Sequence, residues 1–200
     1  MLQLAVFASG QGSNLEAIYN SIKDGSLIGV KLAIVISNNS NSGAHAFARK
    51  NNIEAIHLSL LKCNNDPKQL ESETFGVLQN AKIDIIALAG YMKKLPDRVL
   101  KKYKGRIVNV HPALLPEFGG AGMYGLNVHS AVIASGKKIS GASVHIVEGE
   151  YDSGEIILQE SCSVLKNDTA ESLAERIRKI EHKILPQAIQ IIADKIYKNT

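Results

Sequence analysis

Three side chains of different chemistry stand out at two places in the second half of the chain. Asn109 and His111 lie two residues apart in the segment NVHPALLP, and Asp152 lies in the polar segment GEYDSGE. On an extended chain, residues two apart project from the same side, about 7 Å from one another. Pro112 excludes His111 from the helical region, which favours this conformation. The amide and the imidazole can therefore face one reacting centre, whereas Asp152 taken alone is more typical of a turn residue that caps its own backbone.

An amide, an imidazole and a carboxylate on separate loops are suited to acyl transfer, in which an amine attacks a carbonyl carbon. Asn109 would donate a hydrogen bond to the oxygen on which negative charge grows, a contact worth about 3 to 4 kcal/mol when it is preorganised. His111, as an imidazolium, would stabilise the same oxygen and act as a general acid. Asp152 would raise the proton affinity of this histidine and, with a water, relay the proton from the amine. The alternative of a metal site lacks support, because the sequence has no H-x-x-x-H spacing and no paired cysteines.

A glycine loop near the start of the sequence could bind an anion. In FASGQGSNLEAI an apolar run ends at the glycines and a helical pattern follows, so backbone N–H groups are expected at the positive end of a helix dipole. The dinucleotide fingerprint requires a third glycine where Leu15 stands, and the P-loop requires Gly-Lys-Ser or Gly-Lys-Thr, which does not follow. We therefore expect Gly12, Ser13 and Asn14 to hold one terminal phosphate. The alternative is an ordinary capping box formed by Ser13 and Glu16.

Hydrophobic periodicity predicts alternating strands and helices around these residues. Strands are expected at about 2–8, 31–36, 54–58, 82–90, 106–110, 141–147 and 155–165, and helices at 14–24, 42–51, 66–80, 97–102 and 127–136. A last helix is expected from Asp168, where Glu171 completes a capping box, and Pro186 is expected to kink or break it. This order predicts a doubly wound α/β fold, a single domain over residues 1–200 with a mixed, mostly parallel sheet and helices on both faces. Such sheets bind ligands at the carboxyl ends of their strands, where a glycine-rich loop at 119–125 could act as a lid.

Composition narrows the class of protein further. The 200 residues are 45% hydrophobic and 21% charged, which is typical of a globular chain. The net charge of +4 comes from cations spread along the expected helices, and only 5% of the residues are aromatic, so we expect no nucleic-acid partner. We see neither a cationic leader nor an apolar run of the roughly 18 residues that a membrane helix needs. This predicts a cytoplasmic protein with no membrane partner, and nothing in the sequence predicts its oligomeric state.

Four segments carry a resemblance to a known family: FASGQGSNLEAI, ALAGYMKKLP, GRIVNVHPALLP and GASVHIVEGEYDSGEIILQE. In this order and spacing they resemble the phosphoribosylglycinamide formyltransferase family, over nearly the whole chain. The resemblance implies a Rossmann-like formyltransferase fold. It also implies transfer of the formyl group of 10-formyltetrahydrofolate to the amine of 5-phosphoribosylglycinamide, a step of de novo purine biosynthesis. The catalytic trio of the family falls on Asn109, His111 and Asp152.

The same resemblance implies which residues contact these two small molecules, with no metal. The phosphate would lie on Gly12, Ser13 and Asn14, and Glu181 in the last helix would contact the ribonucleotide. The folate cosubstrate would lie against two segments. The implied folate contacts are Met92, Lys93, Lys94, Leu95, Glu148, Gly149, Glu150 and Tyr151.

Three other interpretations share part of these features. Methionyl-tRNA formyltransferase has the HPALLP segment but carries a basic C-terminal domain, for which the residues beyond 165 leave space only for one helix. Formyltetrahydrofolate deformylase has the trio but normally adds an N-terminal regulatory domain, whereas the first strand is expected here from residue 2. A non-catalytic nucleotide-binding module would use the glycine loop alone.

Overall fold

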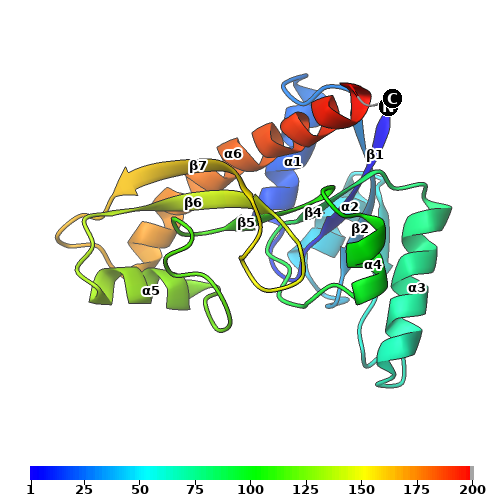
Figure 1. Ribbon diagram of the computed structural model, residues 1–200, viewed down its shortest axis with the longest axis horizontal. Helices are drawn as coiled ribbons and strands as arrows, with labels where there is room; N and C mark the ends of the chain where they lie inside the picture. Colours follow the sequence, from blue (N-terminus) through cyan, green and yellow to red (C-terminus); the bar gives the residue numbers. More distant parts are fainter. Residues whose placement is uncertain (199–200) are drawn as a thin grey trace.

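A seven-stranded sheet forms the centre of the computed structural model, which describes residues 1–198 (Figure 1). Its spatial order is β3-β2-β1-β4-β5-β6-β7. The first five strands in this order run parallel, while β6 pairs antiparallel with β5, and β7 with β6. The predicted mixed, mostly parallel sheet is confirmed. Its strands are β1 (Leu2–Phe7), β2 (Val30–Ser37), β3 (Glu54–His57), β4 (Ile85–Leu88), β5 (Ile107–His111), β6 (Ile139–Ile146) and β7 (Ile156–Ser163).

Helices cover both faces of this sheet, as predicted (Figure 1). Leu4 and Val6 of β1 point into a core that they share with α1, α2, α5 and α6, whereas Ala5 and Phe7 point into a second core shared with α3 and α4. Successive residues of a strand face opposite sides, so a central strand needs apolar residues throughout. The helices are α1 (Ser13–Lys23), α2 (Gly43–Lys50), α3 (Pro67–Asn80), α4 (Asp97–Lys102), α5 (Leu126–Ala134) and α6 (Ala170–Lys198).

Local capping signals explain where α3 and α6 begin. Asp66 accepts a hydrogen bond from the backbone N–H of Lys68 at 2.9 Å and precedes the proline at the first position of α3, as predicted. The predicted start of α6 at Asp168 is wrong, because Thr169 and Ser172 form the capping box through reciprocal hydrogen bonds. Asp168 instead forms an ion pair of 2.8 Å with Arg176, which holds the pKa of this carboxyl well below its usual range.

The last helix continues through Pro186, so the predicted break does not occur. A proline inside a helix removes one hydrogen bond and costs about 3 kcal/mol or more. Here Pro186 is buried within a long apolar face that includes Ile177, Ile184 and Ile189 and packs on the sheet. Burial of this face offsets the local cost, because packing outweighs intrinsic propensity in most protein helices.

Two glycines allow a test of the fold, because the space around Gly76 is open and the space around Gly141 is filled. A Cβ at Gly76, inside α3, would meet nothing within 4 Å, whereas a Cβ at Gly141, in β6, would clash with the backbone oxygen of Glu160 in β7. We expect Gly76→Ala to raise the free energy of unfolding by about 0.5 to 1 kcal/mol, because alanine loses less conformational freedom in a helix. We expect Gly141→Ala to lower it by about 2 kcal/mol or more, because β6 and β7 must separate. Urea unfolding of both variants measures these changes, and a destabilised Gly76→Ala protein would contradict the account of α3.

Candidate active site

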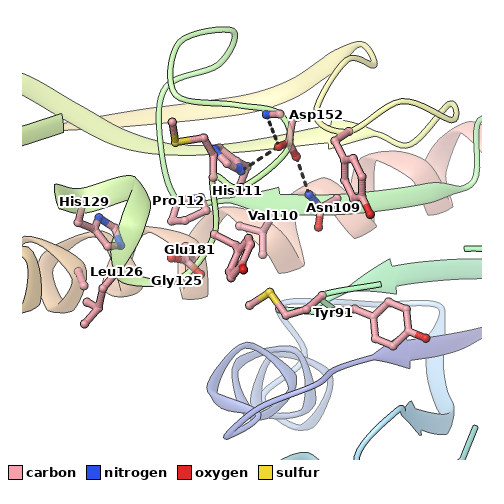
Figure 2. Close-up of a pocket in the computed structure, with 18 of the residues that line it drawn as sticks. Tyr91, Asn109, Val110, His111, Pro112, Gly125, Leu126, His129, Asp152 and Glu181 are labelled. Carbon is pink, nitrogen blue, oxygen red and sulfur yellow. Dashed lines mark hydrogen bonds and ion pairs between the residues drawn. The ribbon is translucent and has the colours of Figure 1, made fainter. Parts of the chain in front are cut away.

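Strand β5 and the turn between β6 and β7 bring the three predicted catalytic side chains into one group (Figure 2). Asn109 and His111 lie near the carboxyl end of β5, and Asp152 lies in the turn. His111 Nδ1 is 3.4 Å from Asp152 Oδ2, and Asn109 Nδ2 is 3.3 Å from Asp152 Oδ1. The carboxylate therefore contacts both the imidazole and the amide.

Groups from outside its own turn hold Asp152. The backbone N–H of Gly120 donates to Oδ2 at 2.9 Å, and His145 Nε2 is 3.4 Å from Oδ1. Burial raises the pKa of Asp152. Hydrogen bonds from His145 and Gly120, with the positive potential of His111 and His145, outweigh burial and hold this pKa below its usual range. Asp152 is thus an ionised carboxylate that joins separate segments, and the alternative of a residue that only caps its own turn does not hold.

His111 is buried, and each of its ring nitrogens faces an oxygen. Nε2 is 2.7 Å from the carbonyl oxygen of Phe118, which can only accept, so Nε2 carries a proton. Nδ1 faces Asp152 and is therefore the nitrogen that gains or loses a proton. Burial lowers the pKa of His111 below its ordinary value, although Asp152 and the Phe118 carbonyl both raise it. Asp152 thus raises the proton affinity of His111, as predicted, while burial has the larger and opposite effect on this pKa.

His145 completes the group, and sequence reasoning missed it because a lone histidine on a strand is usually structural. It lies directly opposite Asn109 on β6, and its Nδ1 is 2.9 Å from the carbonyl oxygen of Ile146. Its Nε2 is 3.4 Å from Asp152 Oδ1 and 3.1 Å from Asn109 Nδ2, so the ring touches both predicted catalytic side chains. Asn109 Nδ2 donates one N–H to Asp152 Oδ1 at 3.3 Å, and an amide nitrogen carries a second N–H.

A cavity of about 490 Å³ opens beside these side chains (Figure 2). Asn109, His111 and Asp152 form one wall, and residues 90–92 after β4 form another. The glycine-rich loop contributes residues 120–126, and α5 and α6 close the remaining side. The cavity therefore lies at the carboxyl ends of β4 and β5, the edge at which open α/β sheets bind ligands.

The glycine loop lies at the start of α1 and forms no capping box. Gly12 occupies the N-cap position with a φ of 84° and no side-chain cap hydrogen bond, and Ser13 is the first helical residue. The backbone N–H groups of Gly12, Ser13 and Asn14 have no acceptor among residues 1–198. A Cβ at Gly12 would lie 2.9 Å from the Cα of Ala44, so glycine also allows α2 to approach this loop. Free N–H groups at a helix N-terminus favour an anion over the capping alternative.

Asn14 connects this loop to the cavity through Glu181. Asn14 Nδ2 donates to Glu181 Oε2 at 2.6 Å, and Asn14 Oδ1 is buried without a partner among residues 1–198. Burial raises the pKa of Glu181, although the hydrogen bond from Asn14 lowers it. Glu181 lines the cavity, whereas Gly12, Ser13 and Asn14 do not. The predicted phosphate-binding loop is thus linked to the wall of the cavity by the hydrogen bond from Asn14 to Glu181.

Most of the predicted folate residues surround a second, smaller cavity of about 60 Å³. Asn109 and Asp152 line both cavities, which therefore adjoin at the candidate catalytic side chains. Met92 lines the larger cavity instead, and Glu148 lines neither, so the structure does not bring Glu148 to the site. The predicted residues that line the smaller cavity are Lys93, Lys94, Leu95, Gly149, Glu150 and Tyr151.

Two more cavity residues, His129 and Arg178, were not predicted from the sequence. Ala174, Arg178 and Glu181 lie at positions i, i+4 and i+7 of α6, a spacing that places them on one face and could have indicated this wall. His129 lies on α5 and is buried. Burial lowers the pKa of His129 to about 4, and the positive potential of His111 and Arg178 acts in the same direction.

The site can donate hydrogen bonds and move protons beside a cavity. An ionised carboxylate, an imidazole with one titrating nitrogen and an amide with a second N–H are groups that transferases use. Within residues 1–198, no helix has both the length and the apolar character to cross a membrane. Within the same residues, no three His, Cys, Asp or Glu side chains are arranged to hold a metal ion. A doubly wound sheet with such a site at its carboxyl edge is typical of α/β transferases that act on small molecules.

Comparison with known proteins makes this class specific: residues 2–189 match the Formyl transferase family, and the chain belongs to it. Two relatives are named chloroplastic phosphoribosylglycinamide formyltransferase. The one from Vigna unguiculata is 40% identical over 194 residues, which cover 96% of this chain and 61% of the relative. The one from Arabidopsis thaliana is 39% identical over 196 residues, which cover 98% and 67%. The chain thus spans about three-fifths of the length of the Vigna relative.

The similarity to a solved structure supports the assignment of the chain to this family. The crystal structure of glycinamide ribonucleotide transformylase 1 from Symbiobacterium toebii matches with a TM-score of 0.90 and 34% sequence identity. The match covers 98% of this chain and 89% of that chain. The expected formyltransferase fold is therefore confirmed.

The burial of His129 makes folding sensitive to acid. Its pKa falls from an ordinary value of 6.5 to about 4 on folding, so the unfolded chain binds the proton first as the pH decreases. The neutral form of buried His129 contributes about 3 kcal/mol to the free energy of unfolding. This contribution is fully present above pH 6.5 and is lost as the pH falls towards the pKa of the folded state. We expect His129→Gln to remove this loss, so that its free energy of unfolding decreases less between pH 7 and pH 4 than that of the wild type. Urea unfolding at several pH values measures the difference, and parallel pH profiles would contradict it.

Proposed function

We propose that this protein transfers the formyl group of 10-formyltetrahydrofolate to the amine of 5-phosphoribosylglycinamide, in the assembly of the purine ring. The observation that carries the proposal is the contact of Asp152 with His111 and Asn109 at the wall of the larger cavity. The printed names of the Vigna and Symbiobacterium relatives support the choice of substrates. We also propose that the protein is cytoplasmic and acts on these small molecules without nucleic acid.

The residues around the two cavities fit a folate. A volume of about 490 Å³ lies in the usual range of ligand pockets, and the tyrosine rings of Tyr91 and Tyr151 offer flat surfaces. Burial raises the pKa of Tyr91 to about 12, so its hydroxyl stays neutral. Lys93 and Lys94 would attract an anionic tail. When bound, the cosubstrate supplies an electrophilic formyl carbon.

Asn109 and His111 would stabilise the negative charge that grows on the formyl oxygen. One N–H of Asn109 donates to Asp152 Oδ1, and the second would donate to the formyl oxygen. A proton on His111 Nδ1 turns the ring into an imidazolium, whose N–H groups face Asp152 and the carbonyl oxygen of Phe118. The ring would therefore act on the formyl oxygen through its positive charge, and Asn109 would supply the hydrogen bond. A fixed donor such as this amide acts without reorganising during the reaction, which is why one such donor is worth about 3 to 4 kcal/mol.

Asp152 would accept the proton that the attacking amine releases. Its pKa lies below the usual range, so the carboxylate is ionised and able to accept. It also lies 3.4 Å from His111 Nδ1, so a proton that reaches either group can be exchanged between them. A water between the amine and Asp152 would complete the path, since a group can take up a proton through one intervening water. The bond between the formyl carbon and N10 of the folate would then break, and the proton held by Asp152 and His111 would pass to N10, which leaves as tetrahydrofolate.

The phosphate of the ribonucleotide would bind at the start of α1. The free N–H groups of Gly12, Ser13 and Asn14 point out of the positive end of the helix dipole, which favours an anion. Glu181 would accept hydrogen bonds from the sugar, next to Asn14. This arrangement would hold the anionic end beside the wall of the cavity and leave the amine directed at the formyl carbon.

The variant Asp152→Asn tests the proton role. We expect kcat to fall by about 10² to 10⁴-fold, because an amide cannot accept the proton, while binding of both substrates is preserved. The measurement is the rate of deformylated folate formation with both substrates. Asp24→Asn is the matched control, because Asp24 is exposed and lines neither cavity. A kcat close to that of the wild type in the Asp152 variant would contradict the mechanism.

Omission of the amine tests the reaction class. A transferase consumes 10-formyltetrahydrofolate only when 5-phosphoribosylglycinamide is present. Turnover of the folate at the same rate without the amine would identify a hydrolase and overturn the proposed function.

A further inference from the structure

His129 is a buried side chain that faces the larger cavity without a hydrogen-bond partner. It is 4% exposed, and it lines the cavity from α5. None of the hydrogen bonds among residues 1–198 involves its ring, and Nδ1 is sealed from solvent. Buried polar groups nearly always have a partner, so this ring calls for a ligand that supplies one.

The surroundings of the ring determine which nitrogen carries its proton. A sealed N–H without an acceptor is costlier and rarer than a sealed lone pair, which places the proton on Nε2 and not on Nδ1. Figure 2 shows the ring extending from α5 towards the side of the cavity on which Glu181 lies. Burial and the positive potential of His111 and Arg178 keep the ring neutral. His129 therefore offers an uncharged N–H donor to whatever occupies the cavity.

We propose that His129 is a further substrate-binding residue, which donates from Nε2 to an uncharged oxygen of the amine-bearing ribonucleotide. The inference rests on the proposed function and adds a contact to the same site. Helix α5 packs against α6, so His129 and Glu181 belong to one wall. The carboxylate of Glu181 accepts from hydroxyl groups and repels a bare carbonyl oxygen, whereas the N–H of His129 binds an oxygen that only accepts. The two side chains together recognise a ligand that carries both kinds of group, as a glycinamide ribonucleotide does.

Two substitutions at this position separate donation from bulk. Glutamine places an amide N–H near the position of Nε2, whereas leucine fills similar space without a donor. We expect His129→Leu to weaken the binding of 5-phosphoribosylglycinamide by about tenfold, the usual effect of one neutral hydrogen bond, and His129→Gln to bind within a factor of a few of the wild type. Isothermal titration calorimetry with the ribonucleotide alone measures both. Binding of 10-formyltetrahydrofolate to each variant shows that the fold is intact, and it should not change.

His182 provides a matched control on the neighbouring helix. Its Nε2 is also buried without a partner among residues 1–198 and burial lowers its pKa, but it does not line the cavity. His182→Leu should therefore leave ribonucleotide affinity unchanged. An equal loss of affinity in the His182 and His129 leucine variants would mean a general structural effect and would overturn the proposal, as would full affinity in His129→Leu.

A second ligand identifies the oxygen that accepts from His129. Ribose 5-phosphate lacks the amide, so an equal loss of its affinity in His129→Leu assigns the contact to a sugar oxygen. A loss confined to the complete ribonucleotide assigns it to the amide carbonyl, and both results support the proposal. Failure of the wild type to bind the ribonucleotide would overturn the proposed function itself. The leucine and glutamine variants test only the contact of His129, so their results leave the proposed function unaffected.

Discussion

The arrangement of the site depends on keeping one carboxylate ionised inside the protein. Asp152 is only partly exposed, and a buried charge is unfavourable unless donors and opposite charges surround it. The structure provides the backbone N–H of Gly120, the amide of Asn109 and the rings of His111 and His145. These partners come from β5, β6 and the glycine-rich loop, so stabilising the charge also fixes how these segments lie. The walls of both cavities follow from this requirement.

Much of the fold could be predicted from the sequence, because its signals are local. The apolar strands, the capping residue Asp66 with the proline after it, and the antiparallel pair at the end of the sheet all follow from patterns within a few residues. The predicted start of α6, and the break that was one of the two outcomes expected at Pro186, are wrong for the opposite reason. Asp168 pairs with Arg176 instead of capping the helix, and Pro186 is tolerated because the helix packs on the sheet. Both depend on contacts that periodicity does not contain.

The residues of the site likewise include some that the sequence could identify and others that it could not. Asn109, His111 and Asp152 could be identified because their types, spacing and neighbouring prolines or glycines are unusual, and the family resemblance assigned them a common role. His145 and His129 carry no such signal, since each lies in an ordinary apolar segment and acquires its meaning only from the residue across the sheet or the cavity beside it. The direction in which the pKa of His111 shifts could not be predicted either, because it reflects a balance between burial and the charge of Asp152.

The hydrogen bond between Asn14 and Glu181 can form only late in the synthesis and folding of the chain. It joins positions 167 residues apart, so nearly the whole chain lies within the loop that it closes. Contacts of such long sequence separation carry a large closure entropy and form late, after local structure has reduced the freedom of the intervening chain. During vectorial synthesis the first helix leaves the ribosome well before the last one exists. A nascent polypeptide can thus assemble most of its parallel strands while it still lacks the carboxylate that completes the region beside the glycine loop.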